Sequence, residues 1–346
     1  MDTGSYQSLL SDIELFIEKN NYPAIFLLAD KTVFDLYPDF FANIFKNKKL
    51  SVFTMQSDEQ HKSIEQAEKI WKEMLSAQLQ KDTLFINWGG GVVSDIGGFV
   101  AATYKRGIDY INIPTTLLSM IDAAIGGKTA INANDIKNCI GSITLPKKVF
   151  VSQLFLDTLP QTEILSGFGE LMKYALIGNA DLWIEIAEFE KIERSSILTE
   201  WILFCKNYKE NITFQDLYDN ANRRLLNFGH TIGHAFESLA MHKKQNISHG
   251  HAIALGMICE AYISVLQGLL PKEKALEIKN VILRHFPLIN ISENDHHLLM
   301  QFINADKKNC NNCINITLLE EIGKGKINGI TNDKEIEDAL SFLKNQ

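Results

Sequence analysis

The sequence predicts an α/β domain followed by a mainly α-helical domain, and two observations carry this prediction. Short apolar segments alternate with amphipathic helical segments up to about residue 156, a rhythm typical of a parallel sheet covered by helices. Beyond that point the segments lengthen and helical periodicity dominates. A chain of 346 residues is long enough for two domains of ordinary size. We therefore expect domains at residues 1–156 and 157–346, with the ligand cleft between them.

The first domain is predicted to contain four buried strands connected by three helices. The most regular helix has apolar residues that recur every three or four positions, which places them on one face. The first of the three helices is interrupted by Pro38. The expected strands are 22–28, 50–55, 83–88 and 110–114, and the expected helices are 31–45, 62–79 and 92–105.

The second domain is predicted to be built from helices, with one exception near the end of the chain. Residues 315–330 are the only segment of this half with a strand-like pattern. The expected helices are 164–178, 180–192, 196–214, 225–241, 251–267 and 274–286.

Composition excludes several classes of function. A net charge of −8 argues against non-specific nucleic-acid binding, which needs a basic surface. The first twenty residues are acidic and amphipathic, unlike a signal peptide, and no apolar run reaches the roughly 18 residues that cross a bilayer. Five cysteines, an odd number, do not suggest a disulfide framework, and the pair Cys310 and Cys313 alone is a weak metal signal. We expect a cytoplasmic protein without nucleic-acid or membrane partners.

A glycine cluster marks the first candidate ligand site. Gly89, Gly90 and Gly91 directly follow the predicted strand 83–88 and open a helix. Ligands of parallel sheets bind beyond the carboxyl ends of the strands, and a helix N-terminus attracts phosphate. The spacing is not that of the dinucleotide fingerprint G-x-G-x-x-G, so a plain tight turn remains an alternative. A second cluster, residues 126–129, resembles the end of a P-loop but lacks its first glycine, so we do not expect ATP binding.

Histidines mark the second candidate site. Of nine histidines, five lie between residues 223 and 257, and His230 and His234 are four positions apart on one expected helix. His249 and His251 lie at the expected start of the next helix. Three protein ligands with one open position is the pattern of catalytic zinc. Hydrogen-bonded core histidines are the alternative, and a zincin is not supported because Thr231 follows His230.

A carboxylate and a group of cations accompany these histidines. Glu170 lies in an otherwise apolar helical segment, where a charged residue needs a partner or a metal. An ion pair with Lys173, three positions later, is the preferred explanation when Glu170 is considered without the histidines. Residues upstream of His230 form a cationic group suited to a carboxylate or phosphate, namely Lys209, Arg223, Arg224 and Asn227.

Taken in order along the chain, these motifs resemble the 3-dehydroquinate synthase family. The combination is more specific than any single motif, although related sugar-phosphate cyclases share parts of it. The resemblance implies an N-terminal Rossmann-like NAD-binding α/β domain and a mainly helical C-terminal metal-binding domain, usually in a homodimer. The matching segments are residues 89–108, 113–132, 137–141, 157–160, 166–177, 223–238, 249–252 and 306–309.

The resemblance also implies roles for individual residues. Zn²⁺, or Co²⁺, is expected on Glu170, His230 and His249. The positions implied to line the NAD site are Asp30, Glu59, Lys62, Gly90, Gly91, Val92, Asp95, Thr115, Thr116, Lys128, Lys137 and Thr158. The positions implied to contact substrate are Asp122, Lys128, Asn138, Lys173, Lys209, Arg223, Asn227, His234 and one lysine of the pair Lys307 and Lys308, assigned as Lys307. Arg106 is implied to reach the substrate phosphate of the partner subunit.

The implied substrate is the small anionic sugar phosphate 3-deoxy-D-arabino-heptulosonate 7-phosphate. The implied reaction yields 3-dehydroquinate, an intermediate of the shikimate pathway of aromatic amino acid biosynthesis. It runs through transient oxidation by NAD, elimination of phosphate, re-reduction and an intramolecular aldol closure. Another sugar-phosphate cyclase, a metal- and NAD-dependent polyol dehydrogenase and a non-catalytic binding protein are the alternatives.

Two departures from the family pattern concern the sites. His251 stands where most of the family has Glu, so it is either a changed outer residue of the metal site or a competing ligand. The segment before Lys62 lacks the usual Pro-Gly-Glu lead, which affects the expected ribose contact of Glu59.

Overall fold

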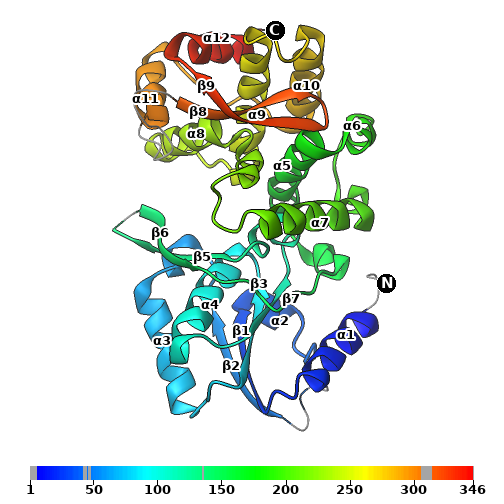
Figure 1. The fold of residues 1–346 in the computed structure, drawn as a ribbon, viewed down its shortest axis with the longest axis vertical. Helices are drawn as coiled ribbons and strands as arrows, with labels where there is room; N and C mark the ends of the chain where they lie inside the picture. Colours follow the sequence, from blue (N-terminus) through cyan, green and yellow to red (C-terminus); the bar gives the residue numbers. More distant parts are fainter. Residues whose placement is uncertain (1–5, 42–44, 46–47, 135, 305–313, 346) are drawn as a thin grey trace. The chain divides into compact units, whose positions relative to one another are not determined.

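The computed structural model describes residues 6–41, 45, 48–134, 136–304 and 314–345. The chain folds into two compact units, Met1–Pro160 and Gln161–Gln346. The first contains a parallel sheet with helices and the second is mainly helical, which confirms the predicted fold class (Figure 1).

The first unit is organised by a five-stranded parallel sheet of order β2-β1-β3-β4-β7. All four predicted strands are present, and a short fifth strand completes the sheet. Their bounds are β1 (Ala24–Asp30), β2 (Lys49–Met55), β3 (Thr83–Gly89), β4 (Tyr110–Pro114) and β7 (Lys148–Val149).

Both faces of the sheet are covered, so its central strands are buried along their whole length. Phe26 and Phe85 project from one face into a core shared with α3 (Ile64–Ser76) and α4 (Gly91–Thr103). Trp88 lies on the other face and packs against Phe40 and Phe41. Figure 1 shows α3 and α4 on one side of the sheet and α1 (Tyr6–Lys19) on the other.

One predicted element of this unit needs correction, and one element was not predicted. The helix expected over 31–45 ends early, since α2 spans Lys31–Leu36 and residues 37–41 form turns. Pro38 is the physical reason, because a proline disfavours helical geometry in the residue before it. In addition, the sequence analysis did not identify the antiparallel hairpin of β5 (Lys128–Ala133) and β6 (Ile136–Ile143).

The second unit contains all six predicted helices and the predicted strands. The strand-like segment forms an antiparallel pair that turns at Gly323, whose φ is 89°. Its elements are α5 (Gln161–Gly178), α6 (Ala180–Ala187), α7 (Thr199–Gln215), α8 (His230–His242), α9 (His249–Leu266), α10 (Lys272–His285), α11 (Glu293–Asn304), β8 (Ile314–Glu321), β9 (Lys324–Thr331) and α12 (Asp333–Lys344).

The start of α8 differs from the prediction. A helix was expected from residue 225, but residues 222–227 form a 3₁₀ turn and the α-helix begins at His230. Gly229 separates the two with a left-handed φ of 80°, a conformation that glycine adopts without steric cost. His230 is therefore the first residue of its helix rather than an interior one.

Helix α9 is the centre of the second unit, and it packs against α5, α8, α10, α12 and β8. It is long and apolar enough to cross a membrane by length and composition, but 72% of it is buried within the chain. A helix that is apolar on most sides is expected at the core of a large domain.

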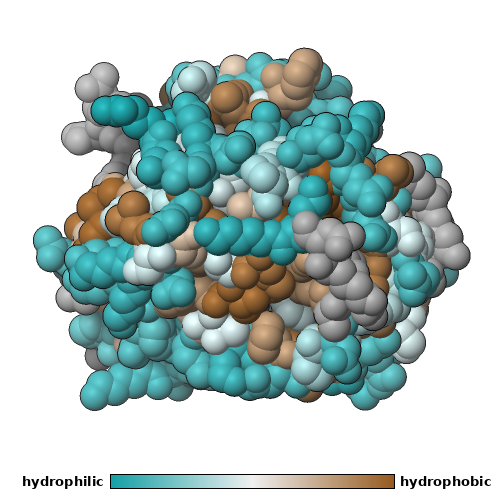
Figure 2. Space-filling view, turned by 90° about the horizontal axis from the view of Figure 1, so that it is seen from below, coloured by the Kyte–Doolittle hydropathy of each residue, from teal (hydrophilic) through white to brown (hydrophobic). Residues whose placement is uncertain are grey.

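Figure 2 shows a face of the protein that is mostly hydrophilic with scattered apolar patches, which is ordinary for a folded protein surface.

Candidate active site

In the first unit, the carboxyl ends of the strands bring together residues that lie far apart in the sequence. Asp30 ends β1, and its side chain caps α2 by accepting the backbone N–H of Val33 at 3.0 Å. The glycine turn ends β3 and begins α4 with backbone groups alone, since Gly90 has no side chain to cap the helix. Thr115 and Thr116 follow β4 at the same edge. This is where a parallel sheet binds its ligand.

Glycine is required in the turn because the chain packs closely there. A Cβ added to Gly89 would lie 2.7 Å from a methyl group of Val93, and one added to Gly90 would lie 3.0 Å from a methyl group of Thr116. Gly90 and Gly91 therefore leave the backbone at the start of α4 open to close approach by a phosphate group.

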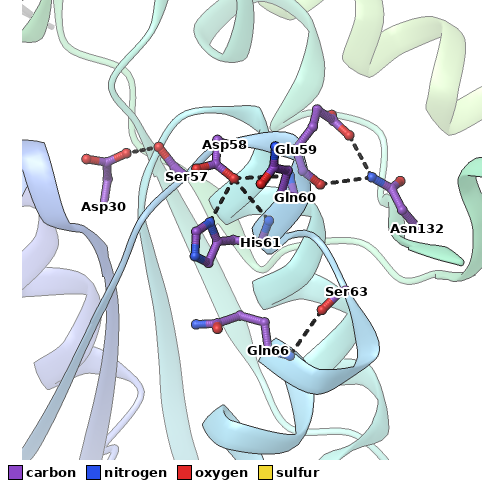
Figure 3. Close-up of polar contacts among 9 residues, drawn as sticks. All are labelled: Asp30, Ser57, Asp58, Glu59, Gln60, His61, Ser63, Gln66 and Asn132. Carbon is purple, nitrogen blue, oxygen red and sulfur yellow. Dashed lines mark hydrogen bonds and ion pairs between the residues drawn. The ribbon is translucent and has the colours of Figure 1, made fainter. Parts of the chain in front are cut away.

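The loop after β2 is held by side-chain hydrogen bonds, which Figure 3 shows. Ser57 donates to Asp30, and Asp58 accepts from the ring of His61 at 2.7 Å. The pKa of Asp58 is lowered by its hydrogen bond to His61. Glu59 accepts the side-chain amide of Asn132, from the hairpin β5–β6, at 2.7 Å.

Asn132 was not identified from the sequence, yet it joins two of the predicted ligand-binding segments. Its side-chain NH₂ also donates to the carbonyl of Glu59 at 3.2 Å, and its backbone N–H donates to the carbonyl of Lys62 at 2.8 Å. Its side-chain oxygen accepts the backbone N–H of Asn138 at 2.9 Å. The buried ammonium of Lys62 in turn binds the side chains of Asp95 and Asn138.

The remaining predicted residues of this unit are more dispersed. The hydroxyl of Thr158 forms a hydrogen bond of 3.0 Å with the hydroxyl of Tyr37, on the segment that follows α2. Asp122 lies in the short helical turn Ser119–Ala123, and Lys128 begins β5. Lys137 is exposed on β6.

In the second unit, three helices converge on one point. Glu170, fully buried in α5, lies 3.4 Å from Nε2 of His230 and 3.2 Å from Nε2 of His249, measured from its Oε1. The two histidines are the first residues of α8 and α9. Among the described residues, these three form a group that could hold a metal ion. Each offers one ligand atom, and these atoms all lie within 4.8 Å of one another.

Close helix packing brings these side chains together. A Cβ on Gly250, next to His249, would lie 1.8 Å from the carbonyl oxygen of Ser166. A Cβ on Gly169, next to Glu170, would lie 2.2 Å from the carbonyl oxygen of Gly250. Helices α5 and α9 therefore touch backbone to backbone at the level of the cluster, and only glycine permits this.

The outer ring nitrogens of both histidines are engaged, which directs the inner ones toward Glu170. Nδ1 of His230 lies 3.1 Å from the carbonyl of Phe228, and Nδ1 of His249 lies 3.2 Å from a carboxylate oxygen of Glu237. Such second hydrogen bonds are typical of metal-binding histidines and set their tautomer. Glu237 was not identified from the sequence.

The pKa values show opposing influences on the two imidazoles. Burial lowers the pKa of His230 well below its ordinary value, although Glu170 acts in the other direction. Burial also acts to lower the pKa of His249, but hydrogen bonds to Glu170 and Glu237 outweigh it and raise that pKa to about 10. The carboxylates that attract a proton to His249 equally attract a divalent cation.

The donor set fits zinc. Ligands about 2.0–2.2 Å from a tetrahedral zinc ion lie roughly 3.4 Å from one another. The separations of 3.4 and 3.2 Å from Glu170 to the two imidazoles agree with this. Two imidazoles and one carboxylate leave a fourth position open, as in catalytic sites, and cobalt accepts the same ligands.

His251 is not part of this group. Its Nε2 lies 2.7 Å from the carbonyl of Pro287, and its ring packs 5.5 Å from that of Phe286. His234 lies closer to the group than His251 does. Its ring is exposed, and the ring centroid lies 5.3 Å from that of His230 and 6.3 Å from that of His249. The alternative that His251 competes as a ligand is therefore not supported by its position.

The polar residues predicted beside the metal come from α5, from α7 and from the 3₁₀ turn 222–227. Lys173 is fully buried and forms an ion pair with Glu170, so the expected ion pair and the metal ligand coexist. Lys209 is buried in α7, and buried Arg223 donates to the carbonyl of Leu217 at 2.7 Å. Asn227 lines a cavity of about 360 Å³ together with Arg224 and Thr231. Lys307, Lys308, Cys310 and Cys313 lie outside the described residues.

Comparisons with known proteins find matches that cover most of the chain. Family models described as 3-dehydroquinate synthase N-terminal and C-terminal match residues 52–166 and 167–309. A 3-dehydroquinate synthase of Parabacteroides distasonis is 35% identical, covering 98% of this chain and 96% of that protein. One of Streptococcus pyogenes serotype M3 is 38% identical over 86% of this chain and 84% of its own length.

Two solved structures share the fold. A 2-epi-5-epi-valiolone synthase from Streptomyces hygroscopicus, with NAD⁺ and Zn²⁺ bound, is 25% identical with a TM-score of 0.82 and covers 94% of this chain and 92% of its own. A 2-deoxy-scyllo-inosose synthase complexed with carbaglucose-6-phosphate, NAD⁺ and Co²⁺ is 24% identical with a TM-score of 0.83 and covers 96% and 94%.

Proposed function

The chain belongs to the 3-dehydroquinate synthase family, and from this we propose that it is a carbon–oxygen lyase that converts 3-deoxy-D-arabino-heptulosonate 7-phosphate to 3-dehydroquinate and phosphate. The observation that carries the proposal is the convergence of Glu170, His230 and His249, from three helices, into one zinc-like donor set. This cluster lies within a chain that matches both family models.

We propose that Glu170, His230 and His249 hold Zn²⁺ or Co²⁺, and that the strand ends of the first unit hold NAD. When bound, the metal supplies a Lewis acid for a substrate hydroxyl and NAD supplies a hydride acceptor. The backbone at the start of α4 suits the pyrophosphate of NAD. Asp95 and Asn138 bind the ammonium group of Lys62, a residue that we assign to the NAD site, and hold it in position.

The cations have the complementary task of holding an anionic substrate. In the second unit, Lys173, Lys209 and Arg223 are buried, which strengthens their electrostatic interactions with a carboxylate or phosphate. Holding the substrate in one orientation also lowers the entropic part of the barrier. We also assign substrate contacts to Asp122, Lys128 and Asn138 of the first unit, and to Asn227, His234 and Lys307 of the second.

The test is release of inorganic phosphate from the heptulosonate phosphate, with and without added NAD. We expect turnover that stops after EDTA treatment and returns with zinc, and no stoichiometric accumulation of NADH, because the hydride returns to the substrate. A polyol dehydrogenase would accumulate NADH instead. Another cyclase would turn over its own sugar phosphate and leave this one intact.

Replacing Asn132 with alanine is expected to weaken NAD binding roughly tenfold, since each lost hydrogen bond costs about 1 kcal/mol. The physical reason is that Glu59 loses both side-chain hydrogen bonds that hold its loop to the hairpin, while the backbone bond from residue 132 to Lys62 remains. Isothermal titration calorimetry with NAD measures the effect. Asn134→Gly, at the exposed turn of the same hairpin, is the control and should bind NAD normally. A wild-type NAD affinity in the Asn132→Ala protein would contradict this role.

We further propose that the protein acts as a cytoplasmic homodimer. Arg106, the residue assigned to the partner's site, is exposed in a turn where Lys105, Arg106 and Gly107 have φ values of 51°, 64° and 105°. Such strained backbone is retained mainly at functional positions. The described cysteines are free thiols, which suits a reducing compartment.

A further inference from the structure

A second buried carboxylate lies on the helix that carries His249. Glu260 is fully buried in α9, eleven residues and about three turns after His249. Both of its oxygens accept backbone N–H groups from the start of α8, that of Gly229 at 2.6 Å and that of Ile232 at 3.3 Å. A buried carboxylate needs such donors, because burial without them costs several kcal/mol.

The start of α8 needs this carboxylate because it cannot cap itself. The N-cap residue is Gly229, which makes no side-chain cap. A side chain is excluded there, since a Cβ would lie 2.5 Å from Cγ of Met257 and 2.8 Å from the carbonyl oxygen of Ile253. The first N–H groups of a helix otherwise lack partners, and an Asp, Asn, Ser or Thr usually provides one. Glu260 provides it from the neighbouring helix.

The residue that follows this cap is His230. We propose that Glu260 is a positioning residue for the metal centre: it holds the first turn of α8 so that Nε2 of His230 faces Glu170. Helix α9 thus contributes one ligand, His249, and through Glu260 it also fixes the position of a second ligand, His230. The inference rests on the proposed metal-binding function of Glu170, His230 and His249.

A purely structural role makes a different prediction, and Ser264 provides the comparison. Ser264 lies one turn after Glu260, is also fully buried, and accepts the backbone N–H of Leu319 at 2.9 Å. Its hydroxyl also donates to the backbone carbonyl of Glu260 at 2.9 Å, so Ser264→Ala removes two buried hydrogen bonds from the same helix while both carboxylate oxygens of Glu260 keep their partners on α8. We therefore expect Ser264→Ala to lower the stability of the protein about as much as Glu260→Gln does, but to leave the position of His230 unchanged.

The experiment compares zinc affinity, by competition with a chromophoric chelator, in the wild-type, Glu260→Gln and Ser264→Ala proteins. In Glu260→Gln, one amide NH₂ faces a backbone N–H, so α8 loses one anchoring bond. We expect its zinc Kd to rise about 10- to 100-fold, the usual cost of losing an outer partner of a metal ligand. The visible spectrum of bound Co²⁺ should also change. Ser264→Ala should keep both the affinity and the spectrum, and NAD affinity should be unchanged in all three.

Wild-type zinc affinity in Glu260→Gln, or an equal loss in Ser264→Ala, would overturn the inference. If Glu260→Gln does not fold, hydrogen exchange of the wild-type protein decides. The amides of Gly229 and Ile232 should be protected with and without zinc, and protection only with zinc would mean that the metal orders α8 instead. A wild-type protein that binds zinc but releases no phosphate would reject the proposed reaction while leaving this comparison valid.

Discussion

Replacing His249 with alanine is expected to weaken zinc binding at least a hundredfold, whereas replacing His251 is expected to leave it nearly unchanged. The two residues flank Gly250, and the resemblance to the family assigns the ligand to His249, with His251 as the alternative. In the structure, His249 directs Nε2 at Glu170, at 3.2 Å. His251 directs its Nε2 at the carbonyl of Pro287, at 2.7 Å.

The size of the effect follows from the number of ligands. Apparent zinc-binding free energies of about 10–16 kcal/mol for four ligands imply roughly 3 kcal/mol for each, or at least a hundredfold in Kd. Loss of His249 also leaves Glu237 without its imidazole partner. Zinc content after dialysis against a weak chelator, and phosphate release, measure the outcome. Full zinc occupancy in His249→Ala, with loss in His251→Ala, would mean that the ligand assignment is shifted along α9.

Replacing Gly250 with alanine is expected to destabilise the second unit by about 3 kcal/mol or more, the upper range for overpacking a well-packed core. The added methyl group would lie 1.8 Å from the carbonyl oxygen of Ser166, which is backbone and cannot move aside as a side chain can. Helix α9 must shift away from α5, which separates His249 from Glu170. The same substitution should therefore also weaken zinc binding.

Gly268, just beyond the other end of α9, is the control for this substitution. Nothing lies within 4 Å of a Cβ added there, although its φ is 69°. Gly268→Ala should therefore cost only the strain of a left-handed alanine, about 1–2 kcal/mol, and should keep zinc affinity. Urea unfolding followed by circular dichroism gives both free energies. Equal destabilisation by the two substitutions would contradict the proposed backbone contact between α5 and α9.

The carboxylates of the second unit illustrate what a sequence reveals. Glu170 stands out because a charged residue in an apolar helix needs an explanation. The same reasoning applies to Glu260, which lies in the long apolar part of α9, and it would have identified that residue as well. It would not have shown that Glu170 faces the two imidazoles while Glu260 faces the start of α8. Those partners come from other helices, and helical periodicity carries no information about them.

The first unit shows a similar limit. The four long strands and the glycine turn were predictable, because buried parallel strands are continuous apolar runs bounded by turn residues. The hairpin β5–β6 was missed, since β6 is largely exposed and both strands mix polar with apolar residues. Asn132 was missed with it. Its four hydrogen bonds reach Glu59, Lys62 and Asn138, and only folding places these partners within reach.

By itself, the sequence determined the fold class, the strand and helix order, and the residue types suited to a metal and a phosphate, because these follow from local periodicity and side-chain chemistry. Tertiary structure decided which imidazole nitrogens face Glu170, that His251 turns to Pro287, and where α8 begins. The physical reason is that each depends on how closely helices approach. Backbone contact at Gly250 and the left-handed turn at Gly229 set that approach, and no local pattern specifies it.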